Sequence, residues 1–104
     1  MATSVDYITF VCEQLAPFGT IRSRRMFGEY IVYLQDKPIL SVCDNTVFAK
    51  KLPDLQPLMA EAACGFPYPG AREHYILDIE DANLLQAVIP MLEKLTPQPK
   101  PRKK

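Results

Sequence analysis

The 104-residue sequence has no tryptophan, a single histidine and no long apolar run. Its apolar stretches are much shorter than the roughly 20 residues that a membrane-spanning helix needs. The N-terminal segment MATSVDYITF has no positively charged region followed by an apolar one, so no signal peptide is expected. We therefore expect a cytoplasmic protein that does not associate with membranes.

Motifs of several reaction classes are also missing. Neither GxGxxG nor GxxxxGK[ST] occurs, which excludes nucleotide-binding loops of those two types. Cys12, Cys43 and Cys64 are widely spaced and form no CxxC pair, so a zinc site is not expected. Buried free thiols are the simpler interpretation, because a reduced cysteine behaves as a small hydrophobic side chain. The prediction is a non-enzymatic chain with no catalytic residues, cofactor or metal.

Two polar features have a structural and a catalytic interpretation. His74 has no serine or cysteine beside it in a nucleophile motif, so a partly exposed position at a strand start is favoured over a catalytic base. The segment DIED, residues 78–81, groups three carboxylates. A strand-to-helix junction in which Asp81 caps the helix is favoured over a metal site.

The composition is that of one ordinary globular domain. Hydrophobic residues make up 48% and charged residues 23% of the chain, whose formal net charge is zero. Lys100, Arg102, Lys103 and Lys104 lie in the last five positions, which leaves 8 basic against 12 acidic residues in 1–99. We predict a mildly acidic domain over residues 1–95 and a disordered, basic, proline-rich tail over 96–104. An acidic body disfavours non-specific binding to duplex DNA.

Periodicity predicts the first half of the fold. Apolar residues spaced by three and four indicate an amphipathic helix over residues 4–16, capped by Thr3 or Ser4. The segments EYIVYL, PILSVC and TVFAK then predict a meander of three antiparallel strands joined by tight turns at QDK and DN. A short strand over residues 21–26 is expected before them.

The second half predicts two more helices and one more strand. A short helix is expected over residues 55–63, capped by Asp54 and ended by Gly65, then a loop at FPYPGA and a strand at HYILDI. DANLLQAVIPMLEKL predicts a helix behind Asp81 that kinks or divides at Pro90. The predicted fold class is α+β, with two layers: an antiparallel sheet of four to five strands and helices on one face.

The segment RSRRMFGEYIVYLQ carries the main candidate site. On a strand, Arg22 and Arg24 share a face and Arg25 points the other way. In the structural interpretation the arginines line a sheet edge and pair with Glu29 or neighbouring carboxylates. In the functional interpretation they form an anion-contact surface with basic residues on a nearby strand end, the candidates being Arg22, Arg24, Arg25, Lys50 and Lys51.

Two further features of this segment bear on its backbone and its core. Gly28 indicates either a bulge or the close approach of another backbone. Tyr30 and Tyr33 should lie on opposite faces, one in the core and one at the surface.

The segment RRMFGEYIVY, with LAPFG before it and FAK and GFPYPG after it, resembles the N-terminal domain of the TfoX/Sxy family of bacterial competence regulators. The resemblance extends over about residues 5–95. Glu29 stands where the family commonly has a second glycine, and the last helix lacks the family's bulky aromatic residue. The matching motif residues, which we expect to be mainly structural, are Arg25, Met26, Phe27, Gly28, Tyr30, Phe66 and Tyr68.

The resemblance implies a stand-alone regulatory or adaptor domain in transcription that acts through protein partners. Longer family members carry a second, C-terminal helical domain, whereas this sequence ends in a basic tail, and we therefore expect a stand-alone version of the N-terminal domain. The alternatives are weak, direct nucleic-acid contact through the basic tail and the Arg/Lys residues, and a small-molecule-binding domain. Association into a homodimer is a further expectation, because an open sheet leaves unpaired edges.

Overall fold

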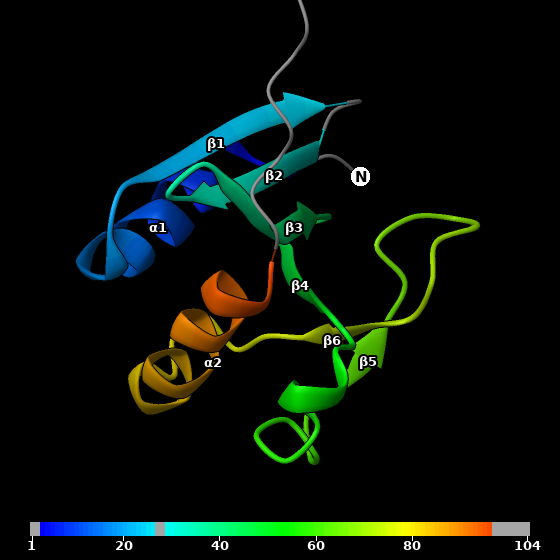
Figure 1. Cartoon of the computed structure of the whole chain (residues 1–104). Coiled ribbons are helices and arrows are strands. Elements are labelled where there is room, and N and C mark those ends of the chain that lie inside the picture. Colours follow the sequence, from blue (N-terminus) through cyan, green and yellow to red (C-terminus); the bar gives the residue numbers. More distant parts are fainter. Residues whose placement is uncertain (1–2, 27–28, 97–104) are drawn as a thin grey trace, which may run out of the picture.

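A computed structural model describes residues 3–26 and 29–96 of the chain. The described residues form two α-helices, two short 3-10 helices and six strands. Their α+β arrangement, shown in Figure 1, is the predicted one. In chain order they are α1 (Val5–Leu15), η1 (Ala16–Phe18), β1 (Ile21–Met26), β2 (Glu29–Leu34), β3 (Lys37–Cys43), β4 (Thr46–Lys50), η2 (Pro53–Leu55), β5 (Cys64–Gly65), β6 (His74–Ile76) and α2 (Ala82–Leu95). Residues 97–104 of the predicted tail lie outside the described residues.

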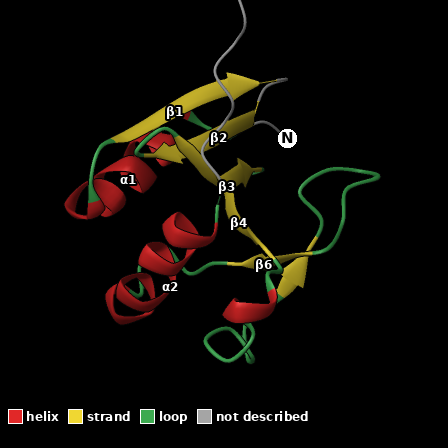
Figure 2. Cartoon of the chain, in the orientation of Figure 1, coloured by secondary structure: helices red, strands yellow, loops and turns green. Residues whose placement is uncertain are grey.

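All strands join one antiparallel sheet in the order β1-β2-β3-β4-β6-β5 (Figure 2). The strands β2, β3 and β4 form the predicted meander of three strands, and β1 is the short strand expected before it. Its two tight turns have positive φ at Gln35 and Asp36, and at Asp44 and Asn45, which matches the twist of a two-residue hairpin. The sheet exceeds the predicted four to five strands because β5, only two residues long, pairs with β6 at the far edge.

Both helices begin at the caps that the sequence predicts. The Ser4 side chain accepts a hydrogen bond from the Tyr7 N–H at 3.1 Å, and the Asp81 carboxylate accepts one from the Leu84 N–H at 3.0 Å. Each cap satisfies a backbone donor that has no partner within the helix. The α2 helix runs through Pro90 without a break, so the alternative of two short helices is wrong.

The helix predicted over residues 55–63 does not form. The chain instead makes the η2 turn and irregular turns, with hydrogen bonds from the N–H groups of Leu58 and Met59 to the Leu55 carbonyl. Pro57 has no N–H to continue a helical series, and only Leu55 and Met59 of the turns at 53–61 are buried. Two buried anchors hold this segment without a helix, and Gly65 belongs to β5 rather than to a helix end.

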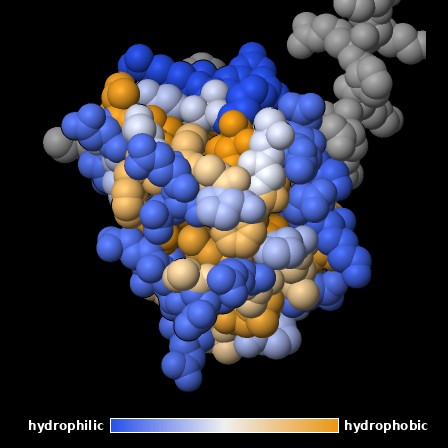
Figure 3. Space-filling view, turned by 90° about the vertical axis from the view of Figure 1, so that its left-hand side faces the viewer, coloured by the Kyte–Doolittle hydropathy of each residue, from blue (hydrophilic) through white to orange (hydrophobic). Residues whose placement is uncertain are grey.

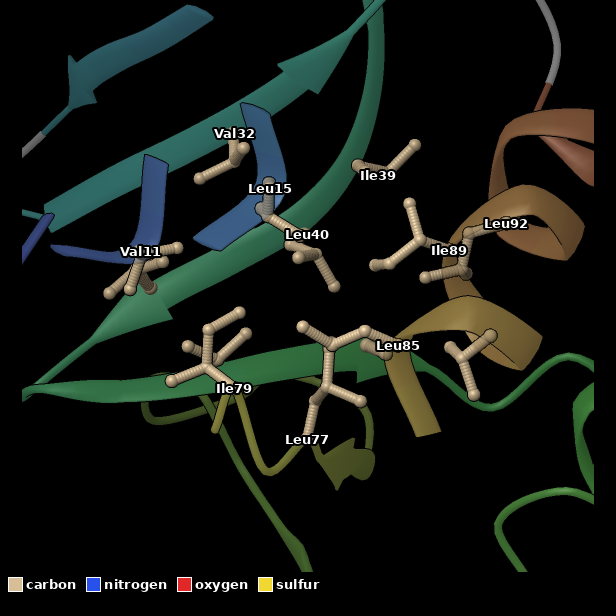
Figure 4. Packing of buried hydrophobic residues seen from close by; sticks show 14 of the residues in the cluster. Val11, Leu15, Val32, Ile39, Leu40, Leu77, Ile79, Leu85, Ile89 and Leu92 are labelled. Atoms are coloured by element: carbon tan, nitrogen blue, oxygen red, sulfur yellow. The ribbon is translucent and has the colours of Figure 1, made fainter. Parts of the chain in front are cut away.

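The core lies between the sheet and the two helices (Figure 4). Val11 and Leu15 of α1 and Ile89 of α2 point toward strand residues such as Val32 and Leu40. Because side chains of a strand alternate, this packing uses one sheet face, and the two-layer prediction is confirmed. On the side shown in Figure 3, the left-hand side of Figure 1, apolar residues gather in the middle and hydrophilic residues surround them.

Candidate functional site

The second face of the sheet, called the open face below, is the one that does not pack on the helices. Strand pairing aligns Arg24, Ile31, Ser41, Phe48 and Ile76 in one row across five strands. Directly paired residues point to the same side of an antiparallel sheet. The row therefore gives the open face a charged edge at β1 and an apolar middle.

A groove of about 1420 Å³ lies on the open face. It is called the open-face groove and is lined by Glu29, Tyr30, Ile31, Ser41, Cys43, Asp44, Thr46, Phe48 and residues 66–71. Residues 66–71 belong to the loop between β5 and β6, which projects at the right of Figure 1. The floor is thus made by the meander, and one wall by a loop that is distant in sequence.

Aromatic side chains dominate the wall of the groove. Phe66 and Tyr68 are each 62% exposed, although they are large hydrophobic residues. Phe48 is buried in the floor beside Gly65, where an added Cβ would come within 3.3 Å of both Phe48 and Ile76. Gly65 thus leaves room for the packed floor, while Phe66 and Tyr68 remain available for contacts with another molecule.

The opposite end of the groove is acidic and firmly built. The Glu29 carboxylate oxygen Oε1 accepts hydrogen bonds from the Thr3 hydroxyl at 2.7 Å, the Thr3 N–H at 3.1 Å and the Asp44 N–H at 3.1 Å. Asn45 completes the network: its N–H donates to the Thr3 hydroxyl, and its side-chain oxygen accepts from the Ser4 N–H. Glu29 therefore ties the N-terminal segment to the β3–β4 turn.

The thiol in the groove is not poised for nucleophilic chemistry. Cys43 is 6% exposed, and burial, with a smaller contribution from the nearby Glu29 carboxylate, raises its pKa to about 11. A thiol must lose its proton to attack, and a pKa this high keeps Cys43 protonated near neutral pH. Burial also raises the pKa of Cys12, which is half-buried, whereas Cys64 is exposed.

The predicted basic residues do not form one surface. Arg22, Arg24 and Arg25 lie on the edge strand β1, as the structural interpretation predicts, and all three are exposed. Lys50 ends β4 and Lys51 directly follows it, three strands away and therefore about 14 Å from β1. The structure thus separates the arginines from the lysines.

Two of these basic side chains also have local partners. Arg22 pairs with Asp36 at 3.5 Å and lies 4.7 Å from the Tyr33 ring centre. Lys51 pairs with Glu73 at 2.7 Å, and this hydrogen bond raises the pKa of Lys51. Glu29, the predicted arginine partner, binds Thr3 and the Asp44 N–H instead. Because Arg22 and Lys51 already pair with carboxylates, fewer of the five candidate side chains are available to bind an anion than the sequence predicts.

His74 and the DIED segment have local structural positions. His74 begins β6, is partly exposed and approaches the Arg72 carbonyl oxygen with Nδ1 at 2.7 Å. Asp78 accepts a hydrogen bond from the Glu80 N–H, and Asp81 caps α2. Within residues 3–26 and 29–96, no three His, Cys, Asp or Glu side chains are grouped in a way that could hold a metal ion.

Comparison with known proteins identifies the family. The family model of the TfoX N-terminal domain matches residues 13–83, which include the groove floor and its aromatic wall. The chain belongs to the TfoX N-terminal domain family. A protein of Spirochaeta aurantia, described as an uncharacterized 12.7 kDa protein in the trpE 5' region, is similar to this TfoX-type chain. The two are 35% identical over 105 residues, which cover 99% of this chain and 91% of the relative.

The motif residues of this TfoX-type domain divide between core and groove. Tyr30 packs against the core, and Tyr33 lies on the open face, as strand alternation predicts. Phe66 and Tyr68, expected to be mainly structural, are exposed in the groove wall. Phe27 and Gly28, with the predicted bulge, lie outside the described residues, and of Met26 only the strand pairing with Glu29 is described.

Sequence reasoning missed the groove floor, formed by Ile31, Cys43 and Phe48. The segment VFA at residues 47–49 contains the pattern that predicts it, because three successive apolar residues in a strand place apolar groups on both faces.

Among the described residues, neither helix of this TfoX-type domain has the length and apolar character needed to cross a membrane.

Proposed function

We propose that the chain is a non-enzymatic regulatory or adaptor domain in the cytoplasm, and that it binds a protein partner in the open-face groove. The observation that carries this proposal is an apolar groove with two aromatic side chains, Phe66 and Tyr68, exposed on its wall. Aromatic residues at the centre of a contact contribute much of the binding energy in protein interfaces. Membership of the TfoX N-terminal domain family supports a competence-regulator-like role in transcription.

The charges favour a protein over a nucleic acid as the partner. Among the described residues that line the groove, Glu29 and Asp44 carry carboxylates and none is a lysine or arginine. Phosphates would be repelled there, whereas an apolar segment with a nearby basic side chain would be attracted. Arg22, at the edge of the same face, already pairs with Asp36 and Tyr33.

The chemistry of the lining also supports a binding role rather than a catalytic one. Cys43 holds its proton, and one oxygen of Glu29 accepts three hydrogen bonds within the fold. A general base or nucleophile needs a lone pair or thiolate directed at a substrate. The Cys43 thiol is instead buried in the sheet, and the Glu29 carboxylate binds the N-terminal segment and the β3–β4 turn.

The proposal is tested by affinity capture from the native cells, with the full chain immobilised. The variant Phe66→Ala/Tyr68→Ala removes the aromatic wall, and Val5→Ala is the matched control, because Val5 is a 65% exposed apolar residue on α1. We expect a reproducible partner that binds the wild type and the control, and at least tenfold less partner on the double variant. Equal capture by all three proteins would contradict the proposal.

A further inference from the structure

The open-face groove and the end of the same chain have complementary chemistry. The groove is apolar and aromatic with carboxylates at one end, while residues 97–104, PQPKPRKK, contain three prolines and four basic residues. We propose that the open-face groove binds residues 97–104 of a second copy of the chain. This inference rests on the proposed function of the groove as a protein-binding site, and it names one occupant.

Proline-rich segments suit a groove of this kind. They favour the extended polyproline II conformation, which has no internal hydrogen bonds, and they dock on aromatic walls at a small entropic cost. Phe66 and Tyr68 offer exposed rings on the wall, and Ile31 and Phe48 offer an apolar floor. Proline rings at residues 97, 99 and 101 would cover these surfaces.

The opposite charges of the tail and of the rest of the chain also favour binding of the tail to a second copy. Lys100, Arg102, Lys103 and Lys104 give the tail four positive charges, whereas residues 1–99 have 8 basic and 12 acidic residues, an excess of four negative charges. The Glu29 carboxylate brings part of that excess to one end of the groove. A basic tail is therefore attracted to the body of another copy, and the attraction falls as salt screens it.

The position of α2 favours a second copy over the chain's own tail. The last turn of α2 lies at the start of β3, where Lys37 Nζ donates a hydrogen bond to the Glu93 carbonyl at 2.9 Å. The acidic end of the groove lies at the other end of β3, beside Cys43, and six residues of strand span about 20 Å. The groove is also on the face of the sheet opposite α2.

The tail of the same chain is too short for that route. It would have to turn round the β2–β3 end of the sheet, cross a layer about 10 Å thick and follow β3, a path of about 30 Å. Eight residues in polyproline II conformation extend about 25 Å. Two copies that exchange tails avoid this limit, and reciprocal exchange produces a symmetric dimer.

Two measurements on full-length protein test the inference. The first is sedimentation equilibrium of the wild type from about 10 µM to 1 mM, beside a tail variant with Lys100→Glu, Arg102→Glu, Lys103→Glu and Lys104→Glu. We expect concentration-dependent dimerisation of the wild type, weakened severalfold at 0.5 M NaCl, and a monomeric tail variant.

The second measurement is fluorescence anisotropy of a labelled peptide of residues 96–104, titrated with the tail variant, whose groove is free of a basic tail. We expect binding that drops at least tenfold on adding Phe66→Ala/Tyr68→Ala and stays unchanged on adding Val5→Ala. A peptide with alanine at positions 97, 99 and 101 keeps every charge and should bind at least fivefold more weakly.

Three results would overturn the inference. They are a wild type that stays monomeric to 1 mM, peptide binding that ignores the loss of Phe66 and Tyr68, and equal binding of the proline and alanine peptides. The last two would show general attraction to an acidic body. Since these experiments use the purified chain alone, their failure leaves the captured cellular partner as an independent test of the proposed function.

Discussion

Replacement of Glu29 by alanine should destabilise the sheet at the acidic end of the groove. One carboxylate oxygen accepts three hydrogen bonds, two from Thr3 and one from the Asp44 N–H, at 2.7 to 3.1 Å. A hydrogen bond contributes about 1 kcal/mol to stability, and more when one partner is charged. Water can replace part of the lost bonding at this partly exposed site, so we expect a loss of about 2–3 kcal/mol.

The assay is urea unfolding followed by circular dichroism, with Glu61→Ala as the matched control, because Glu61 is an exposed glutamate in the turns after η2. In thermal unfolding, a loss of 2–3 kcal/mol in the free energy of unfolding should lower Tm by roughly 10–20 °C in a domain of this size. Glu29→Gln keeps an acceptor oxygen and loses only the charge. It should cost about 1 kcal/mol.

A double-mutant cycle separates the hydrogen bonds from other effects of the substitution. Thr3→Val keeps the shape of the buried Thr3 side chain and removes its hydroxyl from Glu29 and from the Asn45 N–H. Because Thr3 and Glu29 share a bond, their losses should fall short of additivity by about 1 kcal/mol. A Glu29→Ala protein within 0.5 kcal/mol of the wild type, or fully additive losses, would refute this account.

Three further predictions concern stability. Gly65→Val should lower the free energy of unfolding, measured in urea, by about 1–3 kcal/mol, because even a Cβ comes within 3.3 Å of Phe48. An unchanged free energy of unfolding would show that the groove floor can accommodate the larger side chain. Burial raises the pKa of Cys43 to about 11 from an ordinary 9.0. The protonated thiol therefore contributes fully to the free energy of unfolding below pH 9, and this contribution is lost as the pH rises toward 11. Between pH 8 and pH 10.5 the free energy of unfolding should fall by about 2 kcal/mol more in the wild type than in Cys43→Ala. An equal fall in the two proteins would contradict this prediction. Lys37→Met should cost about 1 kcal/mol and raise hydrogen exchange in the last turn of α2, because Lys37 donates to the Glu93 carbonyl; unchanged exchange would rule this out.

Much of the fold follows from local sequence. The helix caps at Ser4 and Asp81, the tight turns at residues 35–36 and 44–45, and the alternation in EYIVYL each depend on neighbouring residues. Such short-range preferences appear directly in a sequence. The prediction over residues 55–63 failed because Leu55 and Met59 find their partners in the tertiary core, and those contacts hold turns where propensity favours a helix.

The groove was beyond local reasoning because its parts are distant in the sequence. Ile31 and Phe48 come from the meander, while Phe66 and Tyr68 come from a loop placed by the pairing of β6 with β4. Strand order is a long-range choice that no short segment encodes. The same choice separated Lys50 from Arg24 by three strands.

The sequence by itself thus determined the two α-helices, the meander and the edge position of the arginines, because each follows from periodicity, capping or residue chemistry. Only the tertiary structure decided which sheet face stays open and which loop forms its wall. It also decided that Glu29 binds Thr3 rather than an arginine. The physical reason is that burial and hydrogen bonding at these places join segments that are distant in the sequence, such as Thr3 and Glu29, which lie 26 residues apart. Whether such segments meet depends on the packing of the whole domain.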